Sequence, residues 1–299
     1  MKAGFVSLVG RPNAGKSTLL NRFVGQKVAI VSDKPQTTRH RIVGVRNVPA
    51  GQIVFIDTPG IHKPVHRMNR RMVDAATSTL REVDVAVLVV DASQPPGAGD
   101  RFVLDLVRSS GVKTILVLNK VDLVRKPALL PIIDQYARAA EFAAIVPLSA
   151  LAGDGVEQLE TEILAALPEA EPLYPEDYLT DQTQRTLASE LIREKVLAHT
   201  RDELPYSTAV VIDQFDEPAE EGGLTRIHAS ILVDHDSQKP IVIGRGGEMI
   251  KRIGTEARRD LEEMLDGKVF LDLHVKVRSD WRDDERILNE IGLGRRSER

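Results

Sequence analysis

A short stretch near the N-terminus has the residue types and spacing of a phosphate-binding loop. Gly10–Ser17 has the sequence Gly-Arg-Pro-Asn-Ala-Gly-Lys-Ser and fits the pattern G-x-x-x-x-G-K-[ST] without a mismatch. Its terminal glycines let the backbone curl until successive N–H groups point at an anion, and the helix expected from Gly15 onward presents its positive end there. Lys16 would bridge the β- and γ-phosphates, and the Ser17 hydroxyl would ligate Mg²⁺. The alternative is a glycine-rich turn that happens to contain Lys-Ser.

A second motif, Asp57-Thr58-Pro59-Gly60, follows an apolar stretch of strand length. The Asp57 carboxylate could hold Mg²⁺ through water, and the Gly60 N–H could contact the γ-phosphate, if the strand ends beside the loop. Taken alone, Asp57 could instead cap the turn that Pro59 and Gly60 shape. The position of the motif after a strand, more than its four letters, favours a nucleotide site.

The sequence Asn119-Lys120-Val121-Asp122 indicates which base is bound. A carboxylate at Asp122 can accept hydrogen bonds from the N1–H and the exocyclic amine of guanine, whereas adenine offers no such donor pair on that edge. Ser149-Ala150 follows the next predicted strand, and we expect the Ala150 N–H to bond the guanine O6. Because each motif comes at the end of a strand, and in this order, the motifs together predict a guanine nucleotide.

The segments that must position these motifs alternate between strands and helices. Apolar periodicity predicts strands near 3–9, 42–48, 52–57, 85–91, 114–119 and 144–148, and helices near 16–24, 66–81, 99–110, 128–140 and 155–166. This alternation is typical of an α/β fold with a mostly parallel six-stranded sheet covered on both faces. The connection at 47–51 is too short for a crossover helix, so the second and third strands should form an antiparallel hairpin at one edge.

The 299 residues suit two domains rather than one core. Residues 1–168 form the first predicted domain, and 169–181, with acidic residues and prolines among few periodic apolar positions, are predicted to be a linker. Residues 182–299 form the second domain. Its predicted elements are a helix near 182–203, strands near 208–215 and 225–233, a helical region from 237 to 266 and a strand near 269–277. This order is typical of an α+β domain.

Composition narrows the class of protein further. The net charge is −4 and there are no cysteines, so a nucleic-acid role needs a local basic patch, and disulfide frameworks and thiolate metal sites are excluded. Met1-Lys2 leads directly into the first predicted strand, and no apolar run approaches the roughly 20 residues of a membrane span. We therefore expect a soluble, cytoplasmic protein.

The set of motifs resembles the translation-factor-related GTPases and the Era family in particular, because the loop 34–42 is also similar to that family's first switch. The resemblance implies that Thr38 ligates Mg²⁺ when the γ-phosphate is present, with Thr37 as the adjacent candidate. A loop of this length without regular structure is itself typical of a functional segment.

Two residues bear on the rate of hydrolysis. Ile61 follows Gly60 at the place where Ras-like GTPases carry a water-positioning glutamine, so no side chain is assigned as catalytic and we expect slow intrinsic turnover. Asn13 stands where similar GTPases use an asparagine to help bind K⁺. K⁺ is therefore a candidate cofactor beside GTP or GDP and Mg²⁺, the alternative being that Asn13 only shapes the loop.

The second domain contains the loop Gly244-Arg245-Gly246-Gly247, which resembles the G-x-x-G clamp of a KH domain. Such a loop lets the backbone of a single strand approach closely, and Arg245, Lys251 and Arg252 supply positive charge beside it. The order of elements resembles the bacterial, type II KH fold, which would place Ile243 in a short helix rather than a strand. The alternative is a tight helix–helix turn.

The resemblance to Era covers nearly the whole chain, including 203–206 and 281–286. It implies a GTP-dependent factor for assembly of the 30S ribosomal subunit, whose KH domain binds the 3′ region of 16S rRNA and which acts as a monomer. Another single-stranded RNA, or a membrane-linked cell-cycle role at the cytoplasmic face of the inner membrane, is the alternative. A P-loop kinase and an RNA-binding module with a vestigial nucleotide site are the rivals from other classes.

The predicted nucleotide-binding residues are Gly10, Asn13, Ala14, Gly15, Lys16, Ser17, Thr18, Thr38, Asp57, Gly60, Asn119, Lys120, Asp122, Ser149 and Ala150, of which Ser17, Thr38 and Asp57 are the predicted metal ligands. The predicted RNA-binding residues are Ile243, Gly244, Arg245, Gly246, Gly247, Lys251 and Arg252.

Overall fold

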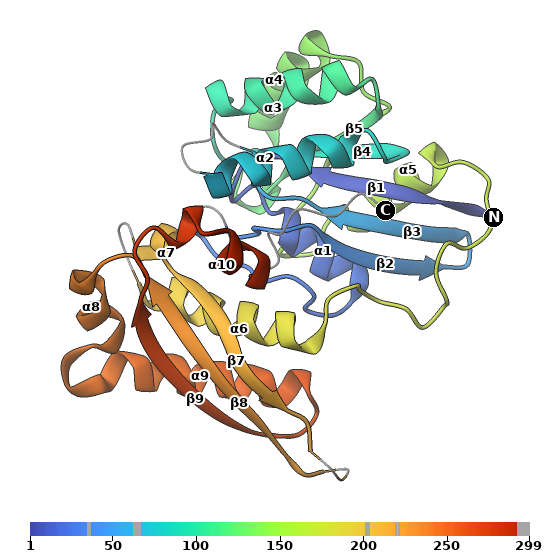
Figure 1. Cartoon of the computed structure of the whole chain (residues 1–299). Coiled ribbons are helices and arrows are strands. Elements are labelled where there is room, and N and C mark those ends of the chain that lie inside the picture. Colours follow the sequence, from blue (N-terminus) through green and yellow to red (C-terminus); the bar gives the residue numbers. More distant parts are fainter. Residues whose placement is uncertain (35–36, 62–66, 201–203, 219, 221, 292–299) are drawn as a thin grey trace. The chain divides into compact units, whose positions relative to one another are not determined.

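The computed structural model describes residues 1–34, 37–61, 67–200, 204–218, 220 and 222–291 (Figure 1). The chain divides into two compact units, one made of Met1–Val31, Gln36–Val65 and Asn69–Asp181 and the other formed mainly by Gln182–Arg299. Residues 35 and 36 of the predicted switch loop, residue 66 at the predicted start of a helix and residues 201–203 at the predicted end of another lie outside the described residues. None of the described helices combines the length and the apolar character needed to cross a bilayer.

A six-stranded sheet forms the centre of the first unit. Its strands are β1 (Lys2–Val9), β2 (Ile42–Val48), β3 (Gly51–Asp57), β4 (Val85–Asp91), β5 (Lys113–Asn119) and β6 (Ala144–Pro147), in the spatial order β2-β3-β1-β4-β5-β6. β2 is antiparallel to β3 and lies at the edge, as the short connection predicted, and the other neighbours are parallel. The parallel strands end at the same side of the sheet, so the motifs that follow β1, β3, β5 and β6 meet there.

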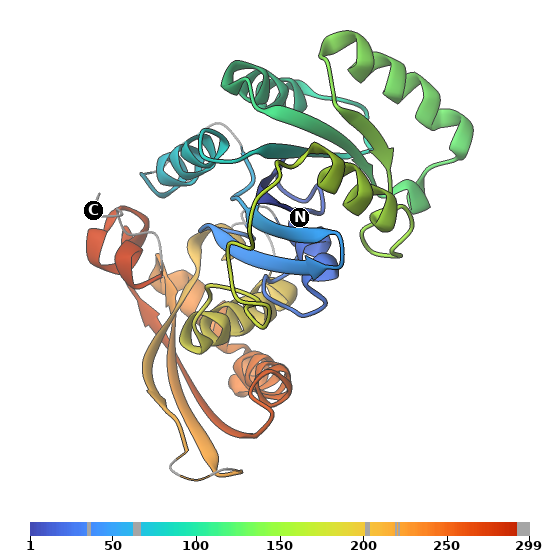
Figure 2. The ribbon, with the colours of Figure 1, turned by 90° about the vertical axis from the view of Figure 1, so that its right-hand side faces the viewer.

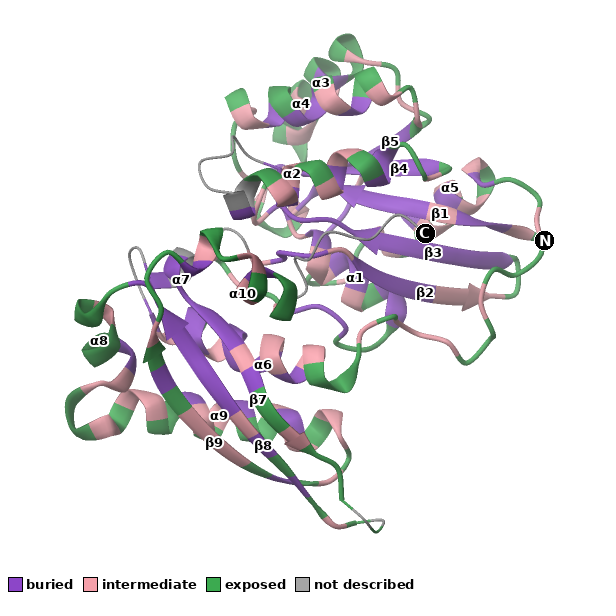
Figure 3. Ribbon diagram, in the orientation of Figure 1, coloured by how far each residue is buried: buried purple, intermediate pink, exposed green. Residues whose placement is uncertain are grey.

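Helices cover both faces of this sheet. α1 (Lys16–Val24) and α5 (Val156–Ala166) pack on one face, and α2 (Arg67–Leu80), α3 (Ala98–Ser110) and α4 (Lys126–Ala139) pack on the other. Along β4, Val87 and Val89 face α1 whereas Leu88 and Val90 face α2 and α3, which is the two-residue alternation of a strand buried on both sides. Figure 3 shows these strands buried between the helical layers. The predicted α/β fold is confirmed.

Residues 169–181, which we call the strap, follow the β2–β3 hairpin (Figure 2) and group with the first unit. The Val45 N–H donates to Leu179 O at 2.8 Å, and Thr180 Oγ1 donates to Val43 O at 2.6 Å. The stacked rings of Tyr174 and Tyr178, with centroids 4.6 Å apart, are packed with three valines. The valines are Val43, Val45 and Val54. The segment predicted as a linker is therefore an ordered layer on the side of the hairpin opposite α1.

The second unit is a three-stranded sheet with helices on one face. β7 (Ala209–Asp216) is antiparallel to β8 (Leu224–Val233), which is parallel to β9 (Lys268–Val277). α6 (Gln184–His199) and α9 (Glu248–Met264) bury their apolar sides in a core shared with the sheet. The remaining helices are α7 (Leu204–Ser207), α8 (Lys239–Ile243) and α10 (Glu285–Glu290). Ile243 lies in α8, as the KH resemblance predicted, and the type II order of elements is confirmed.

Candidate functional site

The phosphate-binding loop joins β1 to α1, and its two glycines are required by their neighbours. A Cβ atom on Gly10 would lie 2.3 Å from Val89 O, and one on Gly15, whose φ is +99°, would lie 2.1 Å from Asn119 Nδ2. Any larger residue would push the loop away from β4 and β5. The pattern of glycines therefore follows from close packing as well as from the need to approach a phosphate.

Lys16 is folded back onto this loop. Its side chain is 5% exposed, and Nζ donates to Gly10 O at 3.3 Å and to Arg11 O at 3.0 Å. Burial lowers the pKa of the Lys16 ammonium, and the nearby Asp57 carboxylate opposes this shift. The ammonium is thus held at the centre of the loop, where phosphate oxygens can replace the two carbonyl oxygens as its partners.

The three predicted metal ligands converge on one another. Ser17 Oγ donates to Asp57 Oδ2 at 2.7 Å, Thr38 Oγ1 donates to the same oxygen at 3.2 Å, and the two hydroxyl oxygens are 2.7 Å apart. Thr38, from the predicted switch loop, is therefore the threonine whose hydroxyl lies in this cluster. Burial raises the pKa of Asp57, and the charge of Lys16 and the two hydroxyl donors oppose that rise.

These side chains suit Mg²⁺. The Asp57 side chain is fully buried, and its Oδ1 atom has no hydrogen-bond partner among the described residues. Hydroxyl and carboxylate oxygens are the ligands that Mg²⁺ prefers, and a buried carboxylate oxygen without a partner favours a cation beside it. Within the described chain, no group of three His, Cys, Asp or Glu side chains could hold a metal ion. When bound, Mg²⁺ neutralises charge on the β- and γ-phosphate oxygens.

The turn after β3 lies directly against the phosphate-binding loop. A Cβ atom on Gly60 would be 2.7 Å from Pro12 Cα, and the Ile61 N–H donates to Gly10 O at 3.2 Å. The Ile61 side chain is 1% exposed and packs with Ala76 and Leu80 of α2. The Ile61 side chain is therefore part of the core.

Asn119 connects the phosphate-binding loop to the base-recognition motifs. Its Nδ2 donates to Ala14 O at 2.7 Å, and its Oδ1 accepts the Ala150 N–H at 2.9 Å. We expected the Ala150 N–H to bond the guanine O6, but a buried donor needs a partner and Asn119 supplies one. For the expected bond to form, Asn119 Oδ1 and the guanine O6 would have to share the Ala150 N–H. Asp122 is exposed, so its carboxylate is accessible to a base.

Lys120 and Asn21 are fixed by contacts that sequence motifs did not indicate. Lys120 Nζ donates to Asp91 Oδ2 at 2.6 Å, and hydrogen bonds from Lys120 and Ser93 outweigh burial and hold the pKa of Asp91 below its usual value. Asn21 Oδ1 accepts the N–H groups of Val28 and Ala29 at 3.0 and 2.9 Å. Asp91 therefore holds the lysine of the base motif, and Asn21 anchors the chain that leads into the switch loop.

The remaining predicted residues lie in the same region of the first unit. Ala14 and Ser149 are buried, and Thr18 is half-buried. Asn13 is half-buried with a φ of +62°, which asparagine tolerates better than most residues. The structure thus brings the predicted nucleotide-binding residues together at the carboxyl ends of the parallel strands.

In the second unit, the G-x-x-G loop connects α8 to α9. Gly244 has a φ of +76°, and a Cβ atom there would lie 2.6 Å from Met249 Cβ. Gly246 and Gly247 have φ values of +60° and +82°, and a Cβ atom on either would meet nothing within 4 Å. The left-handed backbone explains these glycines, and the open space leaves the loop accessible to a ligand.

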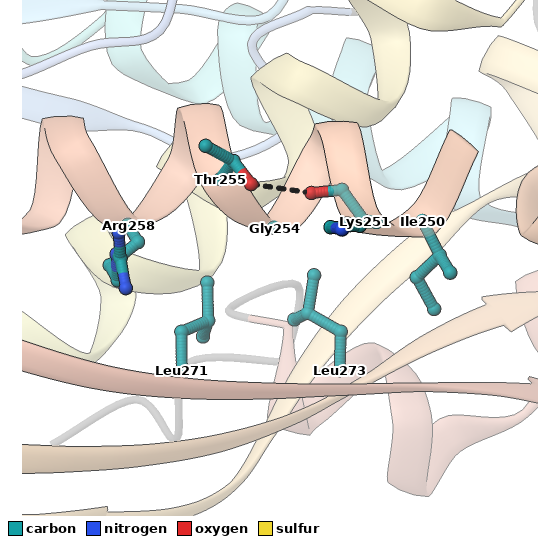
Figure 4. Close-up of a pocket in the computed structure, with 7 residues that line it drawn as sticks. All are labelled: Ile250, Lys251, Gly254, Thr255, Arg258, Leu271 and Leu273. Carbon is teal, nitrogen blue, oxygen red and sulfur yellow. Dashed lines mark hydrogen bonds between the residues drawn. The ribbon is translucent and has the colours of Figure 1, made fainter. Parts of the chain in front are cut away.

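A groove of about 320 Å³ lies between α9 and β9 (Figure 4). Its lining residues are Ile250, Lys251, Gly254, Thr255 and Arg258 from α9 and Leu271 and Leu273 from β9. The two leucines form an apolar floor, and the two cations flank it. The sequence motif indicated Lys251 but not the two leucines, because β9 joins the groove only through the fold.

Arg252 does not line this groove. Successive helical residues are rotated by about 100°, and Arg252 lies on the flank of α9, where its Nε donates to Glu256 Oε1 at 3.2 Å. Glu256 Oε2 is 2.6 Å from His199 Nε2 on α6. The hydrogen bond with His199, helped by that from Arg252, outweighs partial burial and holds the pKa of Glu256 below its usual value. Lys251 and Arg258 line the groove, whereas Arg252 lies beside it.

Comparison with known families agrees with both units. Residues 5–120 match the family described as 50S ribosome-binding GTPase, and residues 203–282 match the KH domain family. GTPase Era of Geobacter metallireducens is 52% identical to this chain over 291 residues, which is 97% of each protein. GTPase Era of Heliobacterium modesticaldum is 45% identical over 298 residues, which is 100% of this chain and 99% of the relative.

Two solved structures resemble the whole chain. A variant of Aquifex aeolicus Era bound to GDP·AlF4⁻ has a TM-score of 0.93 and is 40% identical, and the match covers 99% of this chain and 100% of the Aquifex chain. Era in complex with MgGDPNP and nucleotides 1506–1542 of 16S ribosomal RNA has a TM-score of 0.94 at 40% identity, with coverage of 99% and 100%. Since relatives more than 50% identical align over nearly its full length, the chain belongs to the Era GTPase family.

Proposed function

We propose that this chain is a nucleotide-controlled RNA-binding switch. The first unit binds and hydrolyses GTP, and the groove of the second unit binds the 3′ region of 16S ribosomal RNA. The observation that carries the proposal is the meeting of Ser17, Thr38 and Asp57 beside the phosphate-binding loop, in a chain that also has an open groove between α9 and β9.

The switch rests on Thr38 and Gly60. Thr38 comes from the loop before β2, and Gly60 follows β3, so both can respond to the presence of the γ-phosphate. Nucleotide-state switches of this kind order such loops while the γ-phosphate is present and release them after hydrolysis. Lys16 and the loop amides hold the phosphates of both GTP and GDP. Thr38 and Gly60 are therefore the residues that respond to whether the γ-phosphate is present.

Hydrolysis in the isolated chain should be slow. Ile61 is packed in the core, so the attacking water must be oriented by backbone, by another group or by a partner. We propose that K⁺, held with the help of Asn13, contributes to this step. The test is the rate of GTP hydrolysis in K⁺ and in Na⁺ at equal ionic strength. A faster rate in K⁺ that Asn13→Ala removes supports the role, and equal rates in both salts would exclude it.

The groove has the chemistry of a single-stranded RNA site. Leu271 and Leu273 offer apolar contact to bases, while Lys251 and Arg258 can pair with phosphates. The related Era structure that holds nucleotides 1506–1542 of 16S ribosomal RNA supports this choice of RNA. A strand from the 3′ end of 16S rRNA should bind more tightly than a scrambled strand of equal length, and a non-hydrolysable GTP analogue should alter its affinity. Equal affinity for both strands would favour another single-stranded RNA.

We infer a monomer in the cytoplasm that joins the 30S ribosomal subunit during its assembly, with peripheral contact to the inner membrane as the second location. Sedimentation of cell extract distinguishes these outcomes: co-migration with 30S particles supports the assembly role, and recovery in the membrane fraction supports the alternative.

A further inference from the structure

Arg22 lies in the last turn of α1, yet its guanidinium contacts a distant part of the chain. Its Nε donates to Ala150 O at 3.3 Å, and its Nη2 donates to Leu151 O. A basic residue at the end of a helix ordinarily interacts with the last carbonyl groups of that helix. Arg22 instead joins α1 to residues 149–155, which we call the Ser149 turn.

The Ser149 turn has hydrogen bonds of its own, and Arg22 binds two carbonyl groups that these bonds do not involve. Ser149 O accepts the Gly153 N–H at 2.7 Å, and Ser149 Oγ accepts the Ala152 N–H at 3.1 Å. Within the part of the chain that the structure describes, these bonds close the turn and do not involve the carbonyl groups of Ala150 and Leu151. Arg22 holds both, so the orientation of these two peptide groups depends on a side chain from α1.

Ala150 is therefore fixed from two sides. Its N–H donates to Asn119 Oδ1, whose amide in turn donates to Ala14 O in the phosphate-binding loop. Its carbonyl accepts from Arg22, which stands on the helix that follows that loop. Because a trans peptide is planar, fixing the Ala150 carbonyl also fixes the direction of the Leu151 N–H. Both backbone donors that could meet a base at the Ser149 turn are thus aligned with the phosphate-binding loop.

We propose that Arg22 is a positioning residue for guanine recognition, acting through the Ser149 turn on the 6-oxo group of the base. This inference rests on the proposed assignment of the Ser149 turn to the base. A guanidinium suits the task because its rigid, planar set of donors spans two successive carbonyl oxygens, whereas a lysine ammonium provides a single point of contact. Asp122 would bind different groups of the base, the N1–H and the 2-amino group, so we expect its contribution to be independent of Arg22.

The test compares three nucleotides with the full-length chain. GDP carries both the 6-oxo oxygen and the 2-amino group that Asp122 would bind. In 6-thio-GDP the weaker acceptor sulfur replaces the 6-oxo oxygen, and IDP lacks the 2-amino group. In Arg22→Ala, GDP affinity should fall by about tenfold, and the preference for GDP over 6-thio-GDP should shrink by a similar factor. The preference for GDP over IDP should stay within about twofold of the wild-type value.

Two further variants separate positioning from general damage. Arg22→Lys should recover part of the lost preference, because an ammonium can still hold one carbonyl. Arg138→Ala removes an exposed arginine of α4 that is paired with Asp134, and it should leave all three affinities unchanged. An equal loss for the three nucleotides in Arg22→Ala, or no loss at all, would overturn the inference. A wild-type chain that binds ADP as well as GDP would instead refute the assignment of the base site itself.

Discussion

The nucleotide site and the RNA groove are built in opposite ways. At the nucleotide site, Asp57 is fully buried, Lys16 is 5% exposed, and both are hydrogen-bonded to neighbouring groups of the protein. In the groove, Lys251 is exposed, and the Arg258 side chain is 54% exposed with its Nε 4.0 Å from Glu262. One site is assembled before its ligand arrives, and the other leaves its cations in solvent.

This difference determines how each site should respond to change. Removing one partner of a buried charged or polar pair costs several kcal/mol of stability or binding free energy, because the other partner stays buried without a hydrogen bond. Exposed cations contribute to phosphate binding individually and are screened by salt. The nucleotide site should therefore be selective and intolerant of substitution, while the groove should lose affinity in smaller, salt-dependent steps.

Asp122→Asn should cause the largest change. The asparagine presents a donor where the carboxylate accepted two hydrogen bonds, so GDP affinity should fall by about 10²- to 10⁴-fold. Xanthosine diphosphate, which carries an oxygen in place of the 2-amino group, should bind better than it does to the wild type. Equilibrium binding of both nucleotides measures the exchange of selectivity. Asp134→Asn, an exposed carboxylate on α4, is the matched control, and unchanged guanine selectivity in Asp122→Asn would contradict the assignment.

Gly246→Asp should weaken RNA binding by on the order of tenfold or more, because a carboxylate would face the phosphates of the strand. The site tolerates this residue, since Asp can adopt the φ of +60° and a Cβ atom there meets nothing within 4 Å. Gly246→Asn has the same shape without the charge and should retain most of the affinity. RNA titration gives the result, with GDP affinity expected to be equal in all three chains. Retained RNA binding in the Asp variant would show that the strand does not approach this loop.

Gly254→Ala should change stability and RNA affinity in opposite directions. A Cβ atom at Gly254 would lie 3.5 Å from Leu273 Cδ1, an ordinary contact, and alanine favours a helix by about 1 kcal/mol over glycine. The free energy of unfolding should rise, while the new methyl group narrows the groove and lowers RNA affinity several-fold. Urea unfolding and RNA titration test the two effects. Ser109→Ala, in the last turns of α3, should affect stability alone, and unchanged RNA affinity in Gly254→Ala would place the strand elsewhere.

The smallest predicted effects separate two neighbouring cations. Lys251→Ala should lower RNA affinity several-fold and reduce the slope of log affinity against log salt by about 1. Arg252→Ala should change affinity by less than about twofold, because the Arg252 guanidinium is directed to Glu256 on the flank of α9. Titrations at several salt concentrations make the comparison. Equal losses in the two variants would mean that the strand wraps over the flank as well.

The parts of the site that lie in continuous motifs could be predicted from the sequence. The phosphate-binding loop follows one strand, and Asp57 and Asp122 follow two others. Because a parallel sheet brings the ends of its strands together, the predicted fold already implied that these groups meet. Thr38 was identified by resemblance, and its hydroxyl lies 2.7 Å from that of Ser17.

The remaining parts depend on contacts between segments that no local pattern connects. Asp91 meets Lys120 across the ends of β4 and β5, and Leu271 and Leu273 reach the groove only because β9 pairs with β8. The bond from the Ala150 N–H to Asn119 could not be predicted, because a motif shows which groups are present and not which of them already bond to each other. The direction of Arg252 likewise depends on Glu256 one turn further along α9.

The strap has a consequence for the solubility of the first unit. β2 is an outer strand, and an open edge of this kind can pair with another chain and lead to aggregation. Asp181 Oδ1 accepts the Val43 N–H at 3.1 Å, and Leu179 and Thr180 occupy the next positions along that edge. A GTPase domain cut at residue 168 would expose both this edge and the valines beneath the two tyrosines. A soluble form of the domain should therefore extend to Asp181.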